Sequence, residues 1–173
     1  MSKQEHTSEK TSRKQVTALH KKLVQKFYVE AGDRVLDYGG GKWDLGVEYF
    51  AKNDVISKVF DPYNRSLPEN FEACKWAANG VDHILLANVL NVIKEAEVRA
   101  DVIRDVSYFK VPVYVIVHPG DNDGIGKKSR DGWQEHRDLK SYMEEIQEAL
   151  GKDWFIVHEY GFLALKPYPK KED

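Results

Sequence analysis

The chain has 173 residues, a formal net charge of −2 and a single cysteine, Cys74. This length suits one domain, the near-neutral charge creates no strong field toward nucleic acid or membranes, and one thiol excludes an intrachain disulfide or a cysteine-cluster metal site. No apolar run is long enough to span a bilayer and the first ten residues contain no secretory signal, so we expect a cytoplasmic protein without a membrane partner.

Hydrophobic periodicity divides the chain into alternating helices and strands between two polar ends. We expect a flexible tail over 1–12, a single domain over 13–168 and a polar tail over 169–173. The predicted helices cover 13–29, 43 to about 53, 94–108 and 139–150. The predicted strands cover 34–38, 55–61, 81–87, 111–117, 154–159 and 162–166. Residues 69–79 fit either a short helix or a helix followed by a degenerate strand, and residues 118–135 fit a long polar loop.

This alternation predicts an α/β fold of the Rossmann-like, doubly wound kind, with a mostly parallel sheet and helices on both faces. The last two strands are separated only by Tyr160 and Gly161, which predicts a C-terminal antiparallel hairpin. Ligands of such sheets bind at the carboxyl ends of the strands, near the point where the strand order reverses. We therefore expect one crevice to be bordered by the segments 37–42, 61–64, 88–91 and 118–123.

The most informative segment begins at Arg34 and reads Arg-Val-Leu-Asp-Tyr-Gly-Gly-Gly-Lys. The strand carries Asp37 near its end and leads into three consecutive glycines, which allow a sharp turn and the close approach of a ligand. A helix follows, and its first N–H groups are free to meet a ligand. The next strand ends on Asp61, whose carboxylate can accept hydrogen bonds from both hydroxyls of a ribose. This βαβ unit predicts a site for a nucleoside-bearing cofactor.

The residues around the glycines disfavour two phosphate-binding alternatives. A P-loop requires Ser or Thr after its lysine, but Trp43 follows Lys42. A dinucleotide site requires Gly-x-Gly-x-x-Gly, but Asp44 occupies the place of the last glycine. Asp37 would also repel a pyrophosphate, whereas it would attract a cation. The segment therefore favours a cofactor that carries positive charge and no phosphate.

Residues 35–41 resemble the first motif of the class I S-adenosylmethionine-dependent methyltransferases, which reads apolar-apolar-Asp/Glu-x-Gly-x-Gly. The resemblance spans about residues 30–120 and implies that S-adenosyl-L-methionine is the cofactor. It also implies that the glycine turn lies along the methionine and ribose portions, and that Asp61 binds the ribose hydroxyls. The segment 88–91 matches the fourth motif of the family, at the end of its fourth strand. Together these motifs are similar to those of small methyltransferase-like proteins, several of them from phages and mobile elements.

The chain departs from the family pattern in three places. The bulky Trp43 stands where many members have a small residue. The third strand of the family is not evident, and residues 77–79 are its best candidate. The Asp/Asn-Pro-Pro-Tyr/Phe motif of DNA amino-methyltransferases is absent at Asn88, which argues against methylation of exocyclic base amines by that scheme.

The candidate site residues follow from these motifs and from their places at strand ends. The expected cofactor-binding residues are Asp37, Tyr38, Gly39, Gly40, Gly41, Lys42, Asp61, Pro62, Tyr63, Asn88, Val89, Leu90 and Asn91. His118 and Asp121 are candidates for a catalytic base at the end of a strand. No metal site is expected, because the calcium-loop pattern that starts at Asp121 has Gly132 where its glutamate should stand.

The predicted function is methyl transfer from S-adenosyl-L-methionine to an unidentified acceptor, either a small molecule or a macromolecule. Nucleic acid is not indicated as a partner. A homo-oligomer is compatible with the short chain, because a second subunit would supply substrate surface. The alternatives left open are a protein that binds the cofactor without transferring its methyl group, and an enzyme that degrades the cofactor.

Overall fold

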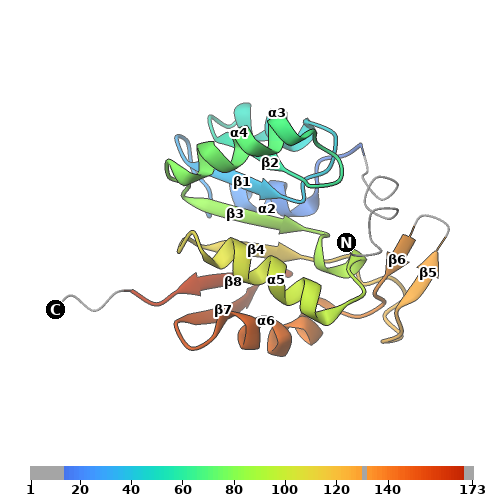
Figure 1. The fold of residues 1–173 in the computed structure, drawn as a ribbon. Helices are drawn as coiled ribbons and strands as arrows, with labels where there is room; N and C mark the ends of the chain where they lie inside the picture. The colour runs from blue at the N-terminus through green and yellow to red at the C-terminus, as the bar shows by residue number, and fades with distance from the viewer. Residues whose placement is uncertain (1–13, 130–131, 170–173) are drawn as a thin grey trace.

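The computed structural model describes residues 14–129 and 132–169, which form a six-stranded sheet covered by helices on both faces (Figure 1). The order of the strands is β2-β1-β3-β4-β8-β7. Their bounds are Arg34–Tyr38 for β1, Ile56–Phe60 for β2, His83–Ala87 for β3, Val113–Ile116 for β4, Trp154–Glu159 for β7 and Phe162–Pro167 for β8. The first four strands are parallel, and β8 runs antiparallel to both of its neighbours, β4 and β7. The predicted α/β fold with its C-terminal hairpin is confirmed.

The helices separate into two layers according to the core that each contributes to. Their bounds are Ala18–Gln25 for α2, Leu45–Ala51 for α3, Leu67–Ala78 for α4, Ala96–Ser107 for α5 and Met143–Leu150 for α6, with short 3₁₀ turns at Leu90–Val92 (η1) and Leu139–Tyr142 (η2). Helices α4, α5 and α6 bury apolar residues in the core of one sheet face, and α2 and α3 in the core of the other. No helix within the described ranges is both long and apolar enough to cross a bilayer.

The first helix is shorter than predicted. Helix α2 begins after Thr17, whose side chain caps it, and ends at Gln25 rather than at residue 29. Phe27, which was expected on its buried face, adopts a left-handed conformation with φ of 58° and is 79 % exposed. The chain turns there so that Val29 enters the core. The tail expected over 1–12, and all of the other tail except residue 169, lie outside the described residues.

Residues 69–79 form no strand. They belong to α4, which begins with a capping box between Ser66 and Glu69 and buries Ala73 and Ala77, four residues apart, on one face. The third strand suggested at 77–79 is therefore wrong, because this segment is the last turn of α4 and the residue that ends it. As a result, β2 lies at the edge of the sheet.

The region 118–135 contains a hairpin that the sequence analysis treated as part of a loop. Strands β5 (Lys127–Ser129) and β6 (Gly132–Gln134) pair antiparallel as a separate two-stranded sheet. Figure 1 shows this hairpin beyond the end of the main sheet to which the parallel strands point. The backbone N–H of Glu135, just after β6, donates to the carbonyl of Asn91, so the β5–β6 hairpin is joined to the turn that follows β3.

Candidate functional site

A cleft opens at the carboxyl ends of the parallel strands, where the chain crosses from one side of β1 to the other. Its volume is about 720 Å³, which falls within the range of small-molecule sites in proteins. Most of the predicted site residues line it: Asp37, Tyr38, Gly39, Gly40, Gly41, Asp61, Pro62, Tyr63, Asn88, Val89, Asn91 and His118. The structure therefore brings together four segments that are far apart in the sequence.

Three predicted site residues do not line this cleft. Leu90 is fully buried in the apolar core, so it supports the turn after β3 instead of facing a ligand. Lys42 is exposed, and its ammonium lies 5.1 Å from the centroid of the Trp43 ring. Asp121 is exposed on the loop after β4 and reaches the cleft only through its neighbour His136.

The glycine turn is built so that side chains are excluded. Gly39 and Gly41 have left-handed φ values of 80° and 78°. A Cβ on Gly39 would lie 2.5 Å from a methyl carbon of Val89, and a Cβ on Gly40 would lie 2.6 Å from Oδ2 of Asp37. The three glycines therefore form a bare stretch of backbone in the wall of the cleft, as the sequence predicted.

Asp37 is the most unusual group in the cleft. Its side chain is buried, with the residue 4 % exposed, and its Oδ2 lies 3.1 Å from Nε2 of His20. Its Oδ1 has no hydrogen-bond partner within the described part of the chain. A buried carboxylate oxygen without a donor costs free energy, so this atom calls for a donor that the residues of 14–129 and 132–169 do not supply.

Asp61 follows β2 and is equally buried, but its carboxylate is fully engaged by the protein. Oδ2 accepts a hydrogen bond of 2.9 Å from the N–H of Gly41, and Oδ1 accepts those of Tyr63 and Asn64 at 3.0 and 2.9 Å. The side-chain amide of Asn64 contacts both oxygens at 3.1 and 3.2 Å. A carboxylate accepts about four hydrogen bonds, so Asp61 already holds the glycine turn and its own loop together.

The turn that follows β3 contributes a second buried hydrogen-bond acceptor. Asn91 is 2 % exposed, and its Nδ2 donates to Oε1 of Gln134 over 3.2 Å. Its Oδ1 has no partner among the described residues. Asn88 is held in a left-handed conformation with φ of 62°, where the chain turns from β3 into η1. Strain of this kind in a non-glycine residue is common at functional sites.

Tyr38 is fixed by the helix layer next to the cleft. Its hydroxyl donates to Oδ2 of Asp105 on α5 over 3.0 Å, and its ring packs on Phe60 with the centroids 4.8 Å apart. Burial raises the pKa of Tyr38, and the neighbouring Asp105 carboxylate raises it further. Tyr38 therefore stays neutral and acts as a wall of the cleft, not as a base.

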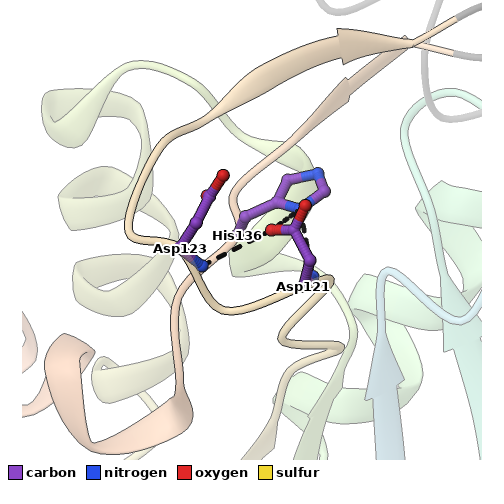
Figure 2. Close-up of side chains that lie close together, drawn as sticks. All are labelled: Asp121, Asp123 and His136. Atoms are coloured by element: carbon purple, nitrogen blue, oxygen red, sulfur yellow. Dashed lines mark hydrogen bonds and ion pairs between the residues drawn. The ribbon is translucent and has the colours of Figure 1, made fainter.

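The loop after β4 places an imidazole in the cleft that the sequence analysis did not single out. Figure 2 shows His136 beside Asp121 and Asp123; its Nδ1 lies 2.6 Å from Oδ1 of Asp121. The ammonium of Lys127 contacts both carboxylates and, with His136, holds the pKa of Asp121 well below its usual range. The three side chains in Figure 2 are close enough to bind a metal ion, but Lys127 already supplies the cation between the two carboxylates.

Two further cleft residues could not be predicted from the sequence. His20 lies on α2, and Gln134 on β6, both far in sequence from the groups that they contact. No local pattern marks either residue, and only the packing of α2 against α3 and β4, and of β6 against η1, brings them into the site. Among the described residues that line the cleft, Asp37 and Asp61 are acidic and none is lysine or arginine.

Comparison with known proteins supports the fold. No protein-family model matches the sequence, and the search of curated proteins found no match. An S-adenosylmethionine-dependent methyltransferase from Aquifex aeolicus has 16 % identity and a TM-score of 0.51, with 84 % of this chain and 87 % of that one covered. Magnesium protoporphyrin IX methyltransferase from Synechocystis, solved with bound S-adenosylhomocysteine, has 12 % identity and a TM-score of 0.54. The match covers 91 % of this chain and 90 % of that one.

A third solved structure, from Nostoc punctiforme, is longer than this protein. It matches with 12 % identity and a TM-score of 0.52. The match covers 85 % of this chain but only 55 % of the Nostoc chain. At these identities the likeness is one of fold. The chain therefore has the fold of the S-adenosylmethionine-dependent methyltransferases.

Proposed function

We propose that the cleft binds S-adenosyl-L-methionine and that the protein transfers its methyl group to an acceptor. The observation that carries this proposal is the charge of the cleft wall, which contains the buried carboxylates of Asp37 and Asp61 and, within the described residues, no lysine or arginine. A nucleotide phosphate would be repelled by this wall. S-adenosyl-L-methionine carries a sulfonium, an ammonium and no phosphate, so it suits the same wall. The shared fold of the solved methyltransferases supports this assignment.

The residues present fit this cofactor at its two ends. Oδ1 of Asp37 would accept from the ammonium of the amino acid portion, which would satisfy an oxygen that has no donor in the described part of the chain. The bare backbone of residues 39–41 would approach the nucleoside closely, and Pro62 and Tyr63 would cover it. Asp61 would reach the ribose hydroxyls by exchanging the side-chain amide of Asn64, the longest of its hydrogen bonds.

The protein's part in the chemistry is mainly positioning. When bound, S-adenosyl-L-methionine supplies a methyl group that is already activated on a sulfonium, so orientation and the exclusion of water can provide much of the rate. Asn88 and Asn91, which follow β3, would orient the molecule that receives the methyl group. Oδ1 of Asn91 can accept a hydrogen bond from it, because this oxygen has no partner among the described residues.

A base is required only for acceptors that must lose a proton. His136 would take that proton at Nε2, because the contact with Asp121 is made at Nδ1. His118 is the second candidate, since it lines the same cleft and is exposed. The nature of the acceptor, a cytoplasmic location and a homo-oligomeric state stay predictions from the sequence.

The experiment is incubation with methyl-labelled S-adenosyl-L-methionine, with and without pooled acceptors from a cell extract. A transferase moves the label to an added acceptor and releases S-adenosylhomocysteine. An enzyme that degrades the cofactor consumes it without an acceptor, and a binding protein returns it unchanged. Either of the last two outcomes would overturn methyl transfer while leaving the cofactor assignment in place.

A further inference from the structure

A second buried ionisable side chain contacts Asp37 from outside the βαβ unit. His20 on α2 is 2 % exposed, and its Nε2 lies 3.1 Å from Oδ2 of Asp37. Its other ring nitrogen, Nδ1, lies 2.7 Å from Oγ1 of Thr17, which also caps the start of α2. Three side chains thus form a chain of contacts, Thr17–His20–Asp37, that runs from the helix to the glycine turn.

Helix α3 and the glycine turn make room for this chain of contacts. A Cβ on Gly46 of α3 would lie 2.4 Å from Nε2 of His20, so only glycine fits there. The ring of Phe50 packs against the imidazole with the centroids 4.8 Å apart. Gly40 makes room for the carboxylate in the same way, as its Cβ would lie 2.6 Å from Oδ2. The histidine is therefore held by packing as well as by polar contacts.

The contacts of the His20 ring indicate which of its two nitrogens carries the hydrogen. Because Nε2 faces Oδ2 of Asp37 and Nδ1 faces the hydroxyl of Thr17, we assign the ring hydrogen to Nε2 and let Nδ1 accept from Thr17. The N–H of Nε2 is not aligned for a hydrogen bond, so its contact with Asp37 is an electrostatic one at 3.1 Å. His20 therefore attracts Oδ2 toward α2, while Oδ1 is left without a donor among the described residues.

We propose that His20 is a positioning residue that aims the carboxylate of Asp37, so that the cleft selects nucleosides bearing an amino acid end. This inference rests on the proposed function and deepens it. The ammonium of such a ligand would meet Oδ1, the oxygen that His20 leaves free. A nucleoside without the amino acid portion gains nothing from this arrangement. His20 thus contributes to the choice among adenosine derivatives and not to the binding of adenosine itself.

The test compares two probes by calorimetry: S-adenosylhomocysteine, which has the amino acid end, and 5′-methylthioadenosine, which lacks it. In His20→Met, a side chain of similar length without a donor, we expect the affinity for S-adenosylhomocysteine to fall about tenfold, the effect of about one charge-assisted hydrogen bond. The affinity for 5′-methylthioadenosine should stay within about twofold of the wild-type value. In His20→Gln, which retains an N–H donor, most of the loss should be restored.

The control is another histidine–carboxylate pair far from the cleft. His83 at the start of β3 has its Nε2 3.2 Å from Oδ2 of Asp33, so His83→Met removes a similar contact without touching the site. It should leave both affinities unchanged. Thr17→Val, which removes the hydroxyl at Nδ1, should weaken S-adenosylhomocysteine selectively by about threefold.

Each result decides the proposal. Equal weakening of both probes in His20→Met would assign His20 a purely structural role, and unchanged affinities would remove it from the site. If His20→Met does not fold, Thr17→Val decides by the same comparison. If the wild-type protein binds neither probe, the proposed function itself falls, and this inference falls with it; the two failures are therefore distinguishable.

Discussion

At the scale of single residues, the two buried carboxylates of the cleft differ in how many of their hydrogen-bonding positions the protein already fills. Asp61 accepts hydrogen bonds from three backbone N–H groups and an amide, so its hydrogen-bonding capacity is already filled. Within the described chain, Oδ2 of Asp37 lies 3.1 Å from the His20 ring and Oδ1 has no hydrogen-bond partner. The unsatisfied carboxylate is therefore the group that a cationic ligand would complete.

The charge of Asp37 can be removed with little change in shape. We expect Asp37→Asn to weaken the binding of S-adenosyl-L-methionine at least about tenfold, because a charge-assisted hydrogen bond becomes a neutral one. Isothermal calorimetry measures this loss. The matched control is Asp33→Asn, which removes a carboxylate from the remote histidine His83 and should leave the affinity unchanged. Equal affinity of Asp37→Asn and the wild type would remove Asp37 from the site.

The middle glycine of the turn tests the close packing of the site. A Cβ at Gly40 would lie 2.6 Å from Asp37 and 3.0 Å from Val59, so Gly40→Ala should lower the free energy of unfolding by about 1–3 kcal/mol. It should also weaken the binding of S-adenosylhomocysteine, because the carboxylate of Asp37 must move. In the control Gly80→Ala, the added methyl meets open space but the left-handed φ is strained, so stability should fall and affinity should not. Wild-type affinity in Gly40→Ala would contradict the packing argument.

Sequence reasoning located the side chains that sit on the βαβ unit but not those that reach it from elsewhere. The strand, the three glycines and the two acids are contiguous enough to be read as one motif, and the glycines and both acids line the cleft. His20 and His136 carry no such signal, because each acquires its role from a partner on another element. Leu90, which stands between Asn88 and Asn91, is fully buried, so its side chain does not line the cleft and its contact with a ligand stays a prediction.

At the scale of secondary-structure elements, the strands were more predictable than the connections between them. The apolar runs of β1, β3 and β4 are buried on both sides and therefore leave an unbroken pattern in the sequence. The hairpin β5–β6 has only three residues in each strand and no apolar alternation, so periodicity cannot reveal it. Helix α4 was ambiguous because its buried positions are mostly small, with alanine at 73 and 77.

A polar network joins the helices on one face of the sheet. Arg99 on α5 donates to both carboxylate oxygens of Glu145 on α6, at 2.7 and 3.0 Å, and Arg137 donates to one of them at 2.9 Å. Arg99 also donates to the carbonyls of Ile93 and Lys94, just after η1. The network thereby links α5, α6 and the segment that follows the cleft wall at Asn91.

This network predicts an acid-dependent loss of stability. Burial alone would raise the pKa of Glu145, but hydrogen bonds from Arg99 and Arg137 outweigh it and hold the pKa below the ordinary value of 4.5. Because the folded pKa is the lower one, the contribution to stability is complete above the unfolded value and is lost as the pH falls through the folded value. We expect Glu145→Gln to lower the free energy of unfolding by about 2 kcal/mol at neutral pH.

Urea unfolding of the wild type and Glu145→Gln between pH 7 and pH 3 measures this effect. The difference between the two proteins should shrink as the pH falls below about 4.5, since the carboxylate is then protonated first in the unfolded chain and, at lower pH, in the folded protein. Glu144→Gln, at the exposed neighbouring position, should unfold like the wild type throughout. A difference that is independent of pH would show that charge at Glu145 is not the cause.

At the scale of the whole molecule, the position of the cleft follows from the order of the strands. The chain places β2 on one side of β1 and then returns through α4 to place β3 on the other, which opens the crevice above β1. With no strand beyond β2 in the described fold, the sheet is narrow on that side, and Ile56 at its edge is 52 % exposed. The site nevertheless receives residues from both cores, through α2 on one face and η1 on the other.

The central claim is that the wall of this cleft accepts a positively charged nucleoside and rejects a phosphate. The most direct measurement is parallel calorimetric titration of the wild-type protein with S-adenosyl-L-methionine and with NAD. We expect saturable binding of S-adenosyl-L-methionine with one site for each chain, and no binding of NAD at the same concentrations. Binding of NAD without binding of S-adenosyl-L-methionine, or a complex with a diphosphate lying along residues 39–41, would contradict the account.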